Sequence, residues 1–141
     1  MAQPTTAGTG TLHLVVVSHQ KKLLEVDCQS VTLPGRQGDL GIFPGHAALI
    51  CTLRPGELSY QSGSGSHRAV IAAGFCQVYA DRVTVLVDRA KLPEQIDAER
   101  ARETLREIEK HLPFAEPEEL DELQDRQREA EAEIAVLAGP R

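Results

Sequence analysis

The 141-residue sequence has no long apolar run, and its few cysteines and histidines show no pairing pattern. No stretch approaches the roughly 20 apolar residues that a membrane-spanning helix needs. Cys28, Cys51 and Cys76 are odd in number and far apart, without any CxxC spacing. We therefore expect reduced cysteines that pack in the core, as in a reducing compartment, and no metal or redox site. The five histidines lack ligand spacing, which argues against zinc.

Signals of catalysis and of targeting are also missing. The stretch "QSGSGSH" at 61–67 has neither the lysine nor the following helix of a P-loop, and it predicts a hairpin tip. No Ser/His/Asp order or metal spacing is present, so we do not expect an enzyme. Residues 1–10 contain no basic region, apolar run or arginine-rich amphipathic pattern, so we expect no secretory or organellar leader.

Charge divides the sequence into two parts. Residues 1–93 carry eight Lys/Arg against six Asp/Glu, a net of +2, whereas residues 94–141 carry seven against fifteen, a net of −8; together they give the overall −6. Pro93, near the boundary, interrupts regular structure. We expect a β-sandwich domain at 1–90, ordered from about residue 11, a linker at 91–96, and a two-helix antiparallel hairpin at 97–141.

The first part is rich in short β-branched segments. Strands are predicted at 12–17, 31–33, 48–53, 69–74, 75–80 and 83–87. Three Pro-Gly pairs recur about every ten residues, and each predicts a type II turn: Pro34-Gly35, Pro44-Gly45 and Pro55-Gly56. Many short strands without helical crossovers favour an antiparallel sandwich or barrel.

The second part has helical periodicity. One apolar stripe runs along each predicted helix: Ala101, Leu105, Ile108 and Leu112 in the first, and Leu120, Leu123, Gln127, Ala130, Ile134 and Leu137 in the second. Asp97 is the expected N-cap of the first helix. Pro117 is expected to open the second, and Gly139-Pro140 to end it.

The two stripes are narrow, and isolated helices of this length are marginal in water. We therefore expect the hairpin to be stabilised by packing on the first domain. Periodicity leaves two alternatives open: a docking arm that moves at small energetic cost, or a helical tail fixed permanently to the sheet.

The segment "GDLGIFPGHAALI" at 38–50 resembles the signature of the epsilon subunit of bacterial F-type ATP synthases, a G-[DE]-x-G-x-x-P-G-H-x-x-[LIF] turn before an apolar strand. Three further segments resemble that family in the same order. They are "LHLVVVSHQKKLLE" at 12–25, "AVIAAGFCQVYADRVTVLVDRA" at 69–90 and "IDAERA" at 96–101. The resemblance covers about residues 12–112.

The resemblance implies a β-sandwich of about ten strands followed by a C-terminal helical hairpin. It implies a non-catalytic rotor subunit of the central stalk, which contacts the gamma subunit and the c-ring and helps transmit torque. The hairpin would either fold on the sandwich or extend along gamma into the alpha/beta hexamer and block ATP hydrolysis. The expected location is the cytoplasmic face of the bacterial inner membrane, without direct membrane insertion and without a nucleic-acid partner.

In this family the signature turn carries the c-ring contact, which the resemblance assigns here to Asp39 and His46. The alternative for Asp39 is a carboxylate that only caps a turn between glycines. The alternative for His46 is an exposed loop histidine without a role. A stiff turn lowers the entropic cost of binding, which suits an interface.

The "IDAERA" motif binds ATP in several relatives, and the match assigns that role to Ile96, Asp97, Arg100 and Ala101. No cofactor is required, and ATP would be a regulatory ligand. The alternative is an ordinary N-cap with an Asp97–Arg100 pair. A further family arginine has no clean counterpart, because Glu107 stands at the expected place.

Arg126 and Arg128 are the candidate regulatory residues of the second helix. In well-studied relatives, basic residues of the hairpin meet an acidic loop of the catalytic subunit. The net −8 of this hairpin opposes such attraction, so either inhibition is weak or these arginines act against the average charge. The rival function is a free-standing ATP-sensing module.

Overall fold

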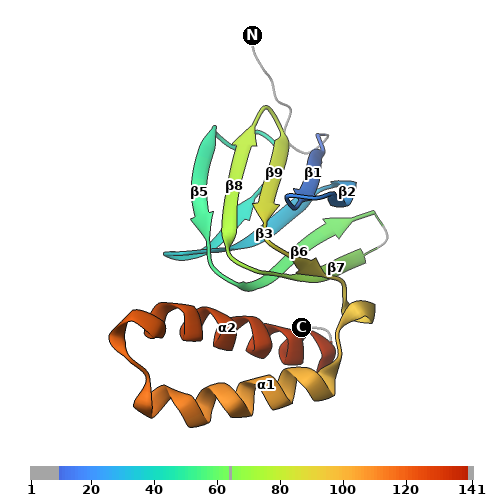
Figure 1. The fold of residues 1–141 in the computed structure, drawn as a ribbon. Coiled ribbons are helices and arrows are strands. Elements are labelled where there is room, and N and C mark those ends of the chain that lie inside the picture. The colour runs from blue at the N-terminus through green and yellow to red at the C-terminus, as the bar shows by residue number, and fades with distance from the viewer. Residues whose placement is uncertain (1–9, 64, 140–141) are drawn as a thin grey trace.

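The computed structural model describes residues 10–63 and 65–139, and within them it shows ten strands followed by two helices (Figure 1). The strands are β1 (Leu12–Val17), β2 (Lys22–Cys28), β3 (Ser30–Gly35), β4 (Gly38–Ile42), β5 (Leu49–Leu53), β6 (Gly56–Ser62), β7 (Gly65–Ile71), β8 (Gly74–Tyr79), β9 (Arg82–Val87) and β10 (Ala90–Lys91). The helices are α1 (Ala98–His111) and α2 (Leu120–Leu137), with 3-10 turns at Pro93–Gln95, Leu112–Phe114 and Pro117–Glu119. The predicted β-sandwich followed by a helical hairpin is confirmed.

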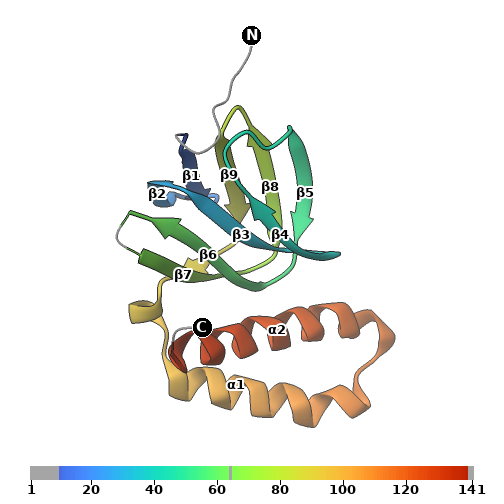
Figure 2. The same cartoon turned by 180° about the vertical axis from the view of Figure 1, so that it is seen from behind.

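The strands form one bent sheet in the order β10-β7-β6-β3-β5-β8-β9-β1-β2, with β4 paired to β3. All the pairings are antiparallel except β1 with β9, where residues 13–17 lie beside residues 82–86. The sheet folds over at β3, whose first half pairs with β6 and whose last residue, Gly35, pairs with Leu53 of β5 (Figure 2). This bend produces two facing layers.

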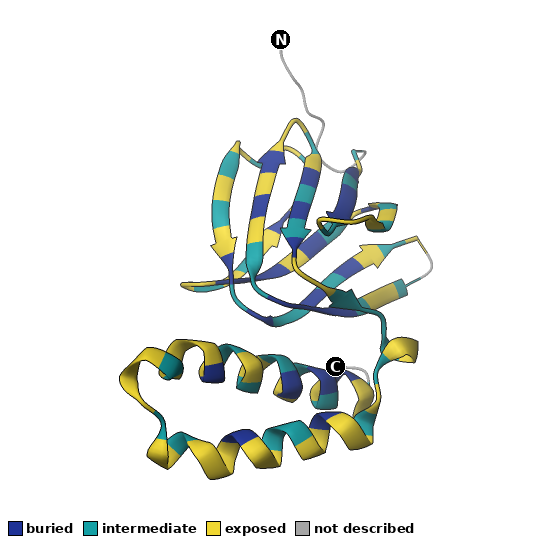
Figure 3. Ribbon diagram, in the orientation of Figure 1, coloured by how far each residue is buried: buried dark blue, intermediate teal, exposed yellow. Residues whose placement is uncertain are grey.

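The core lies between those layers. Its buried side chains come from nine of the strands and are almost all aliphatic (Figure 3). Alternation along a strand selects them: Val83, Val85 and Val87 of β9 point inward, whereas Thr84 and Leu86 are partly exposed. Period-two burial of this kind is what a sheet with one packed face requires.

All three cysteines are free, as predicted. Cys28 and Cys76 are fully buried, and Cys51 is half-buried opposite Cys76 on the neighbouring strand. Burial raises the pKa of the Cys76 thiol to about 12.

One of the three predicted type II turns is present. Gly45 has a φ of 86°, and the amide of His46 bonds the carbonyl of Phe43 at 3.1 Å. The other two predictions are wrong, because Gly35 and Gly56 lie in strands β3 and β6 without a positive φ. The turn after β3 is Arg36-Gln37 instead, and a Cβ on Gly35 would lie 2.5 Å from the carbonyl oxygen of Gly38.

The single strand predicted at 69–74 is also wrong, since β7 ends at Ile71 and β8 starts at Gly74. β7 and β8 belong to different layers, so the chain bends at 72–73 to cross between them. Gly74 fits there because a Cβ would lie 2.1 Å from the carbonyl oxygen of Leu86.

The helices form the predicted antiparallel hairpin, and α2 lies between α1 and the sandwich (Figure 1). Ala101 and Ile108 of α1 and Leu123 and Ala130 of α2 are buried, as the stripes predict. Pro117 opens a 3-10 turn that runs directly into α2. α2 ends at Leu137, before Gly139 with a φ of 125°; Pro140 lies outside the described residues.

α2 has a second face that the stripe did not predict. Glu133 and Val136 are buried against the sandwich side, while Leu120 and Leu137 at the ends of the stripe are exposed. The reason is that α2 packs on two partners at once, α1 on one side and strands β6 and β7 on the other.

Candidate functional site

The Pro44-Gly45-His46 segment forms a stiff corner at the end of the sandwich away from the helices, where β5 begins and the β8–β9 turn lies (Figure 1). The amide of Gly45 donates to the carboxylate of Asp81 in that turn, at 2.7 Å. The ring Nδ1 of His46 donates to the carbonyl of Ala47, also at 2.7 Å. His46 is therefore held in one orientation and is half-buried.

Asp39 lies at the other end of β4. Its exposed carboxylate is 3.8 Å from the guanidinium of Arg54. It lines a shallow groove with Arg128 and Glu131 of α2. The structure therefore does not bring Asp39 and His46 together: Asp39 lies near the start of β4, and His46 closes the type II turn that follows the end of that strand. Asp39 faces the hairpin side and His46 the opposite side.

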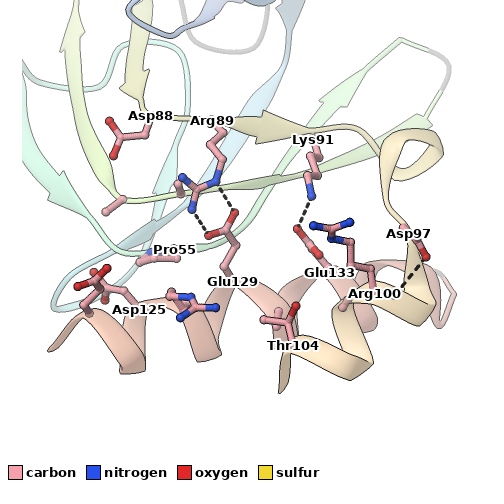
Figure 4. Close-up of a pocket in the computed structure, with 16 residues that line it drawn as sticks. Pro55, Asp88, Arg89, Lys91, Asp97, Arg100, Thr104, Asp125, Glu129 and Glu133 are labelled. Carbon is pink, nitrogen blue, oxygen red and sulfur yellow. Dashed lines mark hydrogen bonds and ion pairs between the residues drawn. The ribbon is translucent and has the colours of Figure 1, made fainter. Parts of the chain in front are cut away.

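The "IDAERA" residues begin α1. The side chain of Asp97 accepts a hydrogen bond from the amide of Arg100 at 3.2 Å, which confirms the N-cap. Asp97, Arg100 and Ala101 line a groove of about 600 Å³ between the hairpin and the sandwich (Figure 4). Ile96 is half-buried but does not line this groove.

The same groove receives one of the two α2 arginines. Arg126 lines it, whereas Arg128 lies in the groove beside Asp39, 3.5 Å from Asp125. The structure thus joins Arg100 of α1 and Arg126 of α2 across one opening. Neither arginine forms an ion pair with another described residue.

The groove has a mixed but mainly acidic lining. Six carboxylates face four cationic side chains, namely Asp88, Asp97, Glu122, Asp125, Glu129 and Glu133 against Arg89, Lys91, Arg100 and Arg126. Glu129 holds Arg89 at 2.6 Å, and Glu133 holds Lys91 at 3.2 Å. Hydrogen bonding to Glu129 raises the pKa of Arg89, so this guanidinium stays charged.

Sequence reasoning missed an apolar surface on the outer face of the sheet. Ile50 of β5 is 74% exposed, and on β8 Phe75 is 49% and Tyr79 65% exposed. Phe75 lies between Thr52 and Leu86 in one cross-strand row, and Ile50 lies beside Gln77 in the next row on the same face. Tyr79 lies farther along β8, so the three apolar side chains share one face of the sheet, with Gln77 between Phe75 and Tyr79. The sequence pattern that indicates this surface is the alternation along β8: Cys76 and Val78 point into the core, so Phe75 and Tyr79 point outward.

Comparison with known proteins identifies the chain. The family model "ATP synthase, Delta/Epsilon chain, beta-sandwich domain" matches residues 11–93. The ATP synthase epsilon chain of Magnetococcus marinus is 35% identical over 131 residues, which cover 92% of this chain and 96% of that protein. The chain belongs to the ATP synthase epsilon chain family. The epsilon chain of Halalkalibacterium halodurans is 38% identical over 111 residues, 79% of this chain and 84% of that protein.

The fold agrees with a solved assembly. A chain in the cryo-EM structure of the Euglena gracilis mitochondrial ATP synthase, containing OSCP, F1 and the c-ring, superposes with a TM-score of 0.78. Identity is 20%, and the match covers 96% of this chain and 91% of that one. Epsilon chains are non-catalytic subunits of ATP synthase, so the chain belongs to the complex without an active site of its own. Among the described residues, none of the helices is long and apolar enough to cross a membrane.

Proposed function

We propose that this epsilon chain acts in the central stalk, between the gamma subunit and the c-ring at the cytoplasmic face of the membrane. The observation that carries the proposal is the division of its surface. A stiff corner lies at one end of the sandwich, a charged helical hairpin at the other, and an apolar sheet face between them. Three separate surfaces suit a subunit that joins several partners.

The corner at His46 is the proposed foot on the c-ring. Its backbone is already fixed by Gly45–Asp81 bonding, so binding orders little chain. Asp39 is the second proposed contact, although its carboxylate lies near Arg54 and the hairpin side. We expect His46→Ala to weaken coupling between proton flow and ATP synthesis in membrane vesicles. Asp39→Asn tests the other residue, and unchanged coupling in both variants would remove the c-ring assignment.

The apolar patch of Ile50, Phe75 and Tyr79 is the proposed docking surface for gamma. An exposed apolar sheet face on a subunit of a complex marks an interface. Phe75→Glu in the full chain should reduce co-purification with gamma at least tenfold. Phe114→Glu is the matched control, because Phe114 is 79% exposed on the hairpin loop. Equal retention of gamma by both variants would move the interface elsewhere.

The hairpin is the proposed regulatory element, which would extend toward the alpha/beta hexamer and slow ATP hydrolysis. The support is the way the hairpin packs: α1 packs mainly on α2, and α2 packs on β6 and β7 of the sandwich. Removing residues 97–141 should raise the ATPase activity of assembled F1. Unchanged activity in a complex that still contains the truncated subunit would make the hairpin passive.

ATP sensing is the second proposed function. The observation in its favour is the groove, which is lined by Asp97, Arg100, Ala101 and Arg126. Neither arginine forms an ion pair with another residue that the structure describes. Guanidinium groups suit phosphate, although the acidic lining opposes it. Millimolar ATP should raise the melting temperature of the isolated chain, and Arg100→Ala should abolish the shift while the exposed Arg102→Ala does not. No shift in the parent chain would remove this function.

A further inference from the structure

Three carboxylates of α2 form a straight row. Asp125, Glu129 and Glu133 are spaced by four residues, so they lie one above another on a single face of the helix. Each of them meets a cation of the sandwich. The pairs are Arg36 with Asp125 at 2.9 Å, Arg89 with Glu129 at 2.6 Å, and Lys91 with Glu133 at 3.2 Å. Two of the pairs are visible in Figure 4.

The cations come from separate parts of the sandwich. Arg36 lies in the turn between β3 and β4, whereas Arg89 and Lys91 lie at and just before β10. Arg36 and Arg89 donate to both oxygens of their carboxylates, which fixes orientation as well as distance. Three pairs in one register can form only when α2 lies in this position along the sandwich.

The carboxylates are shielded more than their partners. Side-chain exposure is 26% for Asp125, 13% for Glu129 and 9% for Glu133, and Glu133 is the buried charged residue among those described. A carboxylate buried without its cation is strongly disfavoured. Val136, three residues after Glu133, is the buried aliphatic side chain next to this row.

We propose that this row is an electrostatic latch that holds the hairpin on the sandwich, so that ionic strength sets how often the hairpin is released. The inference rests on the proposed regulatory role of the hairpin and assigns the contacts that control it. It also gives a role in the docked state to three of the six carboxylates of α2.

Salt acts directly on such a latch. The screening length falls from about 10 Å at 0.1 M salt to about 3 Å at 1 M, and the cations of all three pairs are at least one-third exposed. Loss of a partly exposed pair changes the docked-to-released ratio about threefold, so loss of all three changes it at least tenfold. Apolar packing does not weaken in the same way.

Amide hydrogen exchange of the full chain tests the latch without any other ATP synthase subunit. We expect exchange of α2 amides to accelerate at least tenfold between 50 mM and 1 M KCl, while β8 and β9 amides stay unchanged as an internal reference. The triple variant Asp125→Asn, Glu129→Gln, Glu133→Gln should exchange fast in both salts. Glu103→Gln, Glu107→Gln, Glu109→Gln is the matched control, because it removes three exposed charges from α1.

A charge swap distinguishes the latch from general destabilisation. Arg89→Glu and Glu129→Arg should each accelerate α2 exchange, and the double variant should restore most of the protection. Salt-independent α2 exchange in the parent chain, or a double variant as fast as the singles, would overturn the proposal. Since ATPase activity is not read, failure of the regulatory function leaves a distinct result: a salt-sensitive hairpin whose deletion does not alter F1.

Discussion

The carboxylate of Asp81 accepts a 2.7 Å hydrogen bond from the backbone amide of Gly45, joining two turns that are 36 residues apart in the chain. Asp81 itself has a φ of 63°, a left-handed conformation that Asp and Asn tolerate better than other non-glycine residues. One side chain therefore both shapes the β8–β9 turn and fixes the corner that presents His46.

Asp81→Ala should lower the free energy of unfolding by about 2 kcal/mol, because it removes the acceptor and places alanine at a positive φ. Asp81→Asn keeps an acceptor oxygen and the tolerance for this φ, so it should lose much less. Urea unfolding of the two variants measures the difference. Equal stability of Asp81→Ala and the parent chain would show that the corner does not depend on this bond.

Gly74→Ala should destabilise the sandwich by about 3 kcal/mol. The new Cβ would lie 2.1 Å from the carbonyl oxygen of Leu86 and 2.9 Å from the Cα of Val87. Both are backbone atoms of a central strand, which cannot move without disturbing its hydrogen-bonded neighbours. Gly41→Ala is the control, because its nearest contact is the Phe43 ring at 3.6 Å, and it should change stability by less than about 0.5 kcal/mol. Similar unfolding midpoints would contradict the packing at Gly74.

His13 should make stability depend on pH. Its ring meets Asp27 at 2.7 Å and Glu25 at 2.5 Å, and these hydrogen bonds raise the pKa of His13 above 6.5. The stabilising contribution is complete below pH 6.5 and is lost as pH rises through the folded-state pKa. His13→Gln should remove this decline in a series of thermal unfolding curves. A parent chain whose melting temperature is flat between pH 6 and 9 would contradict it.

Glu25 should make the folding stability depend on pH in the acidic range. Hydrogen bonds from Lys22 and His13 lower its pKa to about 2. Its contribution is therefore present above pH 4.5 and disappears as pH falls toward 2. Glu25→Gln should flatten that part of the stability profile, and the carboxyl carbon shift of Glu25 should titrate near pH 2 in NMR spectra. A midpoint near 4.5 would show that the cluster does not form in solution.

The thiols should be almost inert in the folded chain. Burial raises the pKa of Cys28, and raises that of Cys76 to about 12, so few thiolates form at pH 8. Alkylation followed by mass spectrometry should modify Cys51 slowly and the other two only after denaturation in guanidinium chloride. Rapid labelling of Cys76 under native conditions would mean that β5 and β8 open readily.

The sequence predicted the strands whose apolar residues alternate along the chain and the helices whose apolar residues form one stripe. β1, β8 and β9 and both helices lie where alternation or the helical stripe places them. Local pattern does not predict β2, β4 and β6, because polar or glycine residues interrupt their apolar residues. These segments are strands because neighbouring strands satisfy their backbone hydrogen bonds. Of the three Pro-Gly pairs, only Pro44-Gly45 forms a type II turn, because Gly35 pairs with Leu53 of β5 and Gly56 pairs with Ile71 of β7.

The candidate site was predictable in part for the same reason. The N-cap role of Asp97 is local, and the sequence suffices for it. The groove that joins Arg100 to Arg126 and the pairing of Glu129 and Glu133 with the sandwich depend on how α2 packs between two partners. A single apolar stripe gives no sign of that second face.

The parallel pairing of β1 with β9 also determines when the domain can fold during synthesis. β1 can pair with β2 as soon as residue 28 is available, but its parallel ladder of residues 13–17 with residues 82–86 cannot form until β9 has been synthesised, so the sheet is completed late. α2 docks on β6 and β7 later still, after residue 137 has emerged. The sandwich can therefore fold before the whole helical hairpin is available to dock on it.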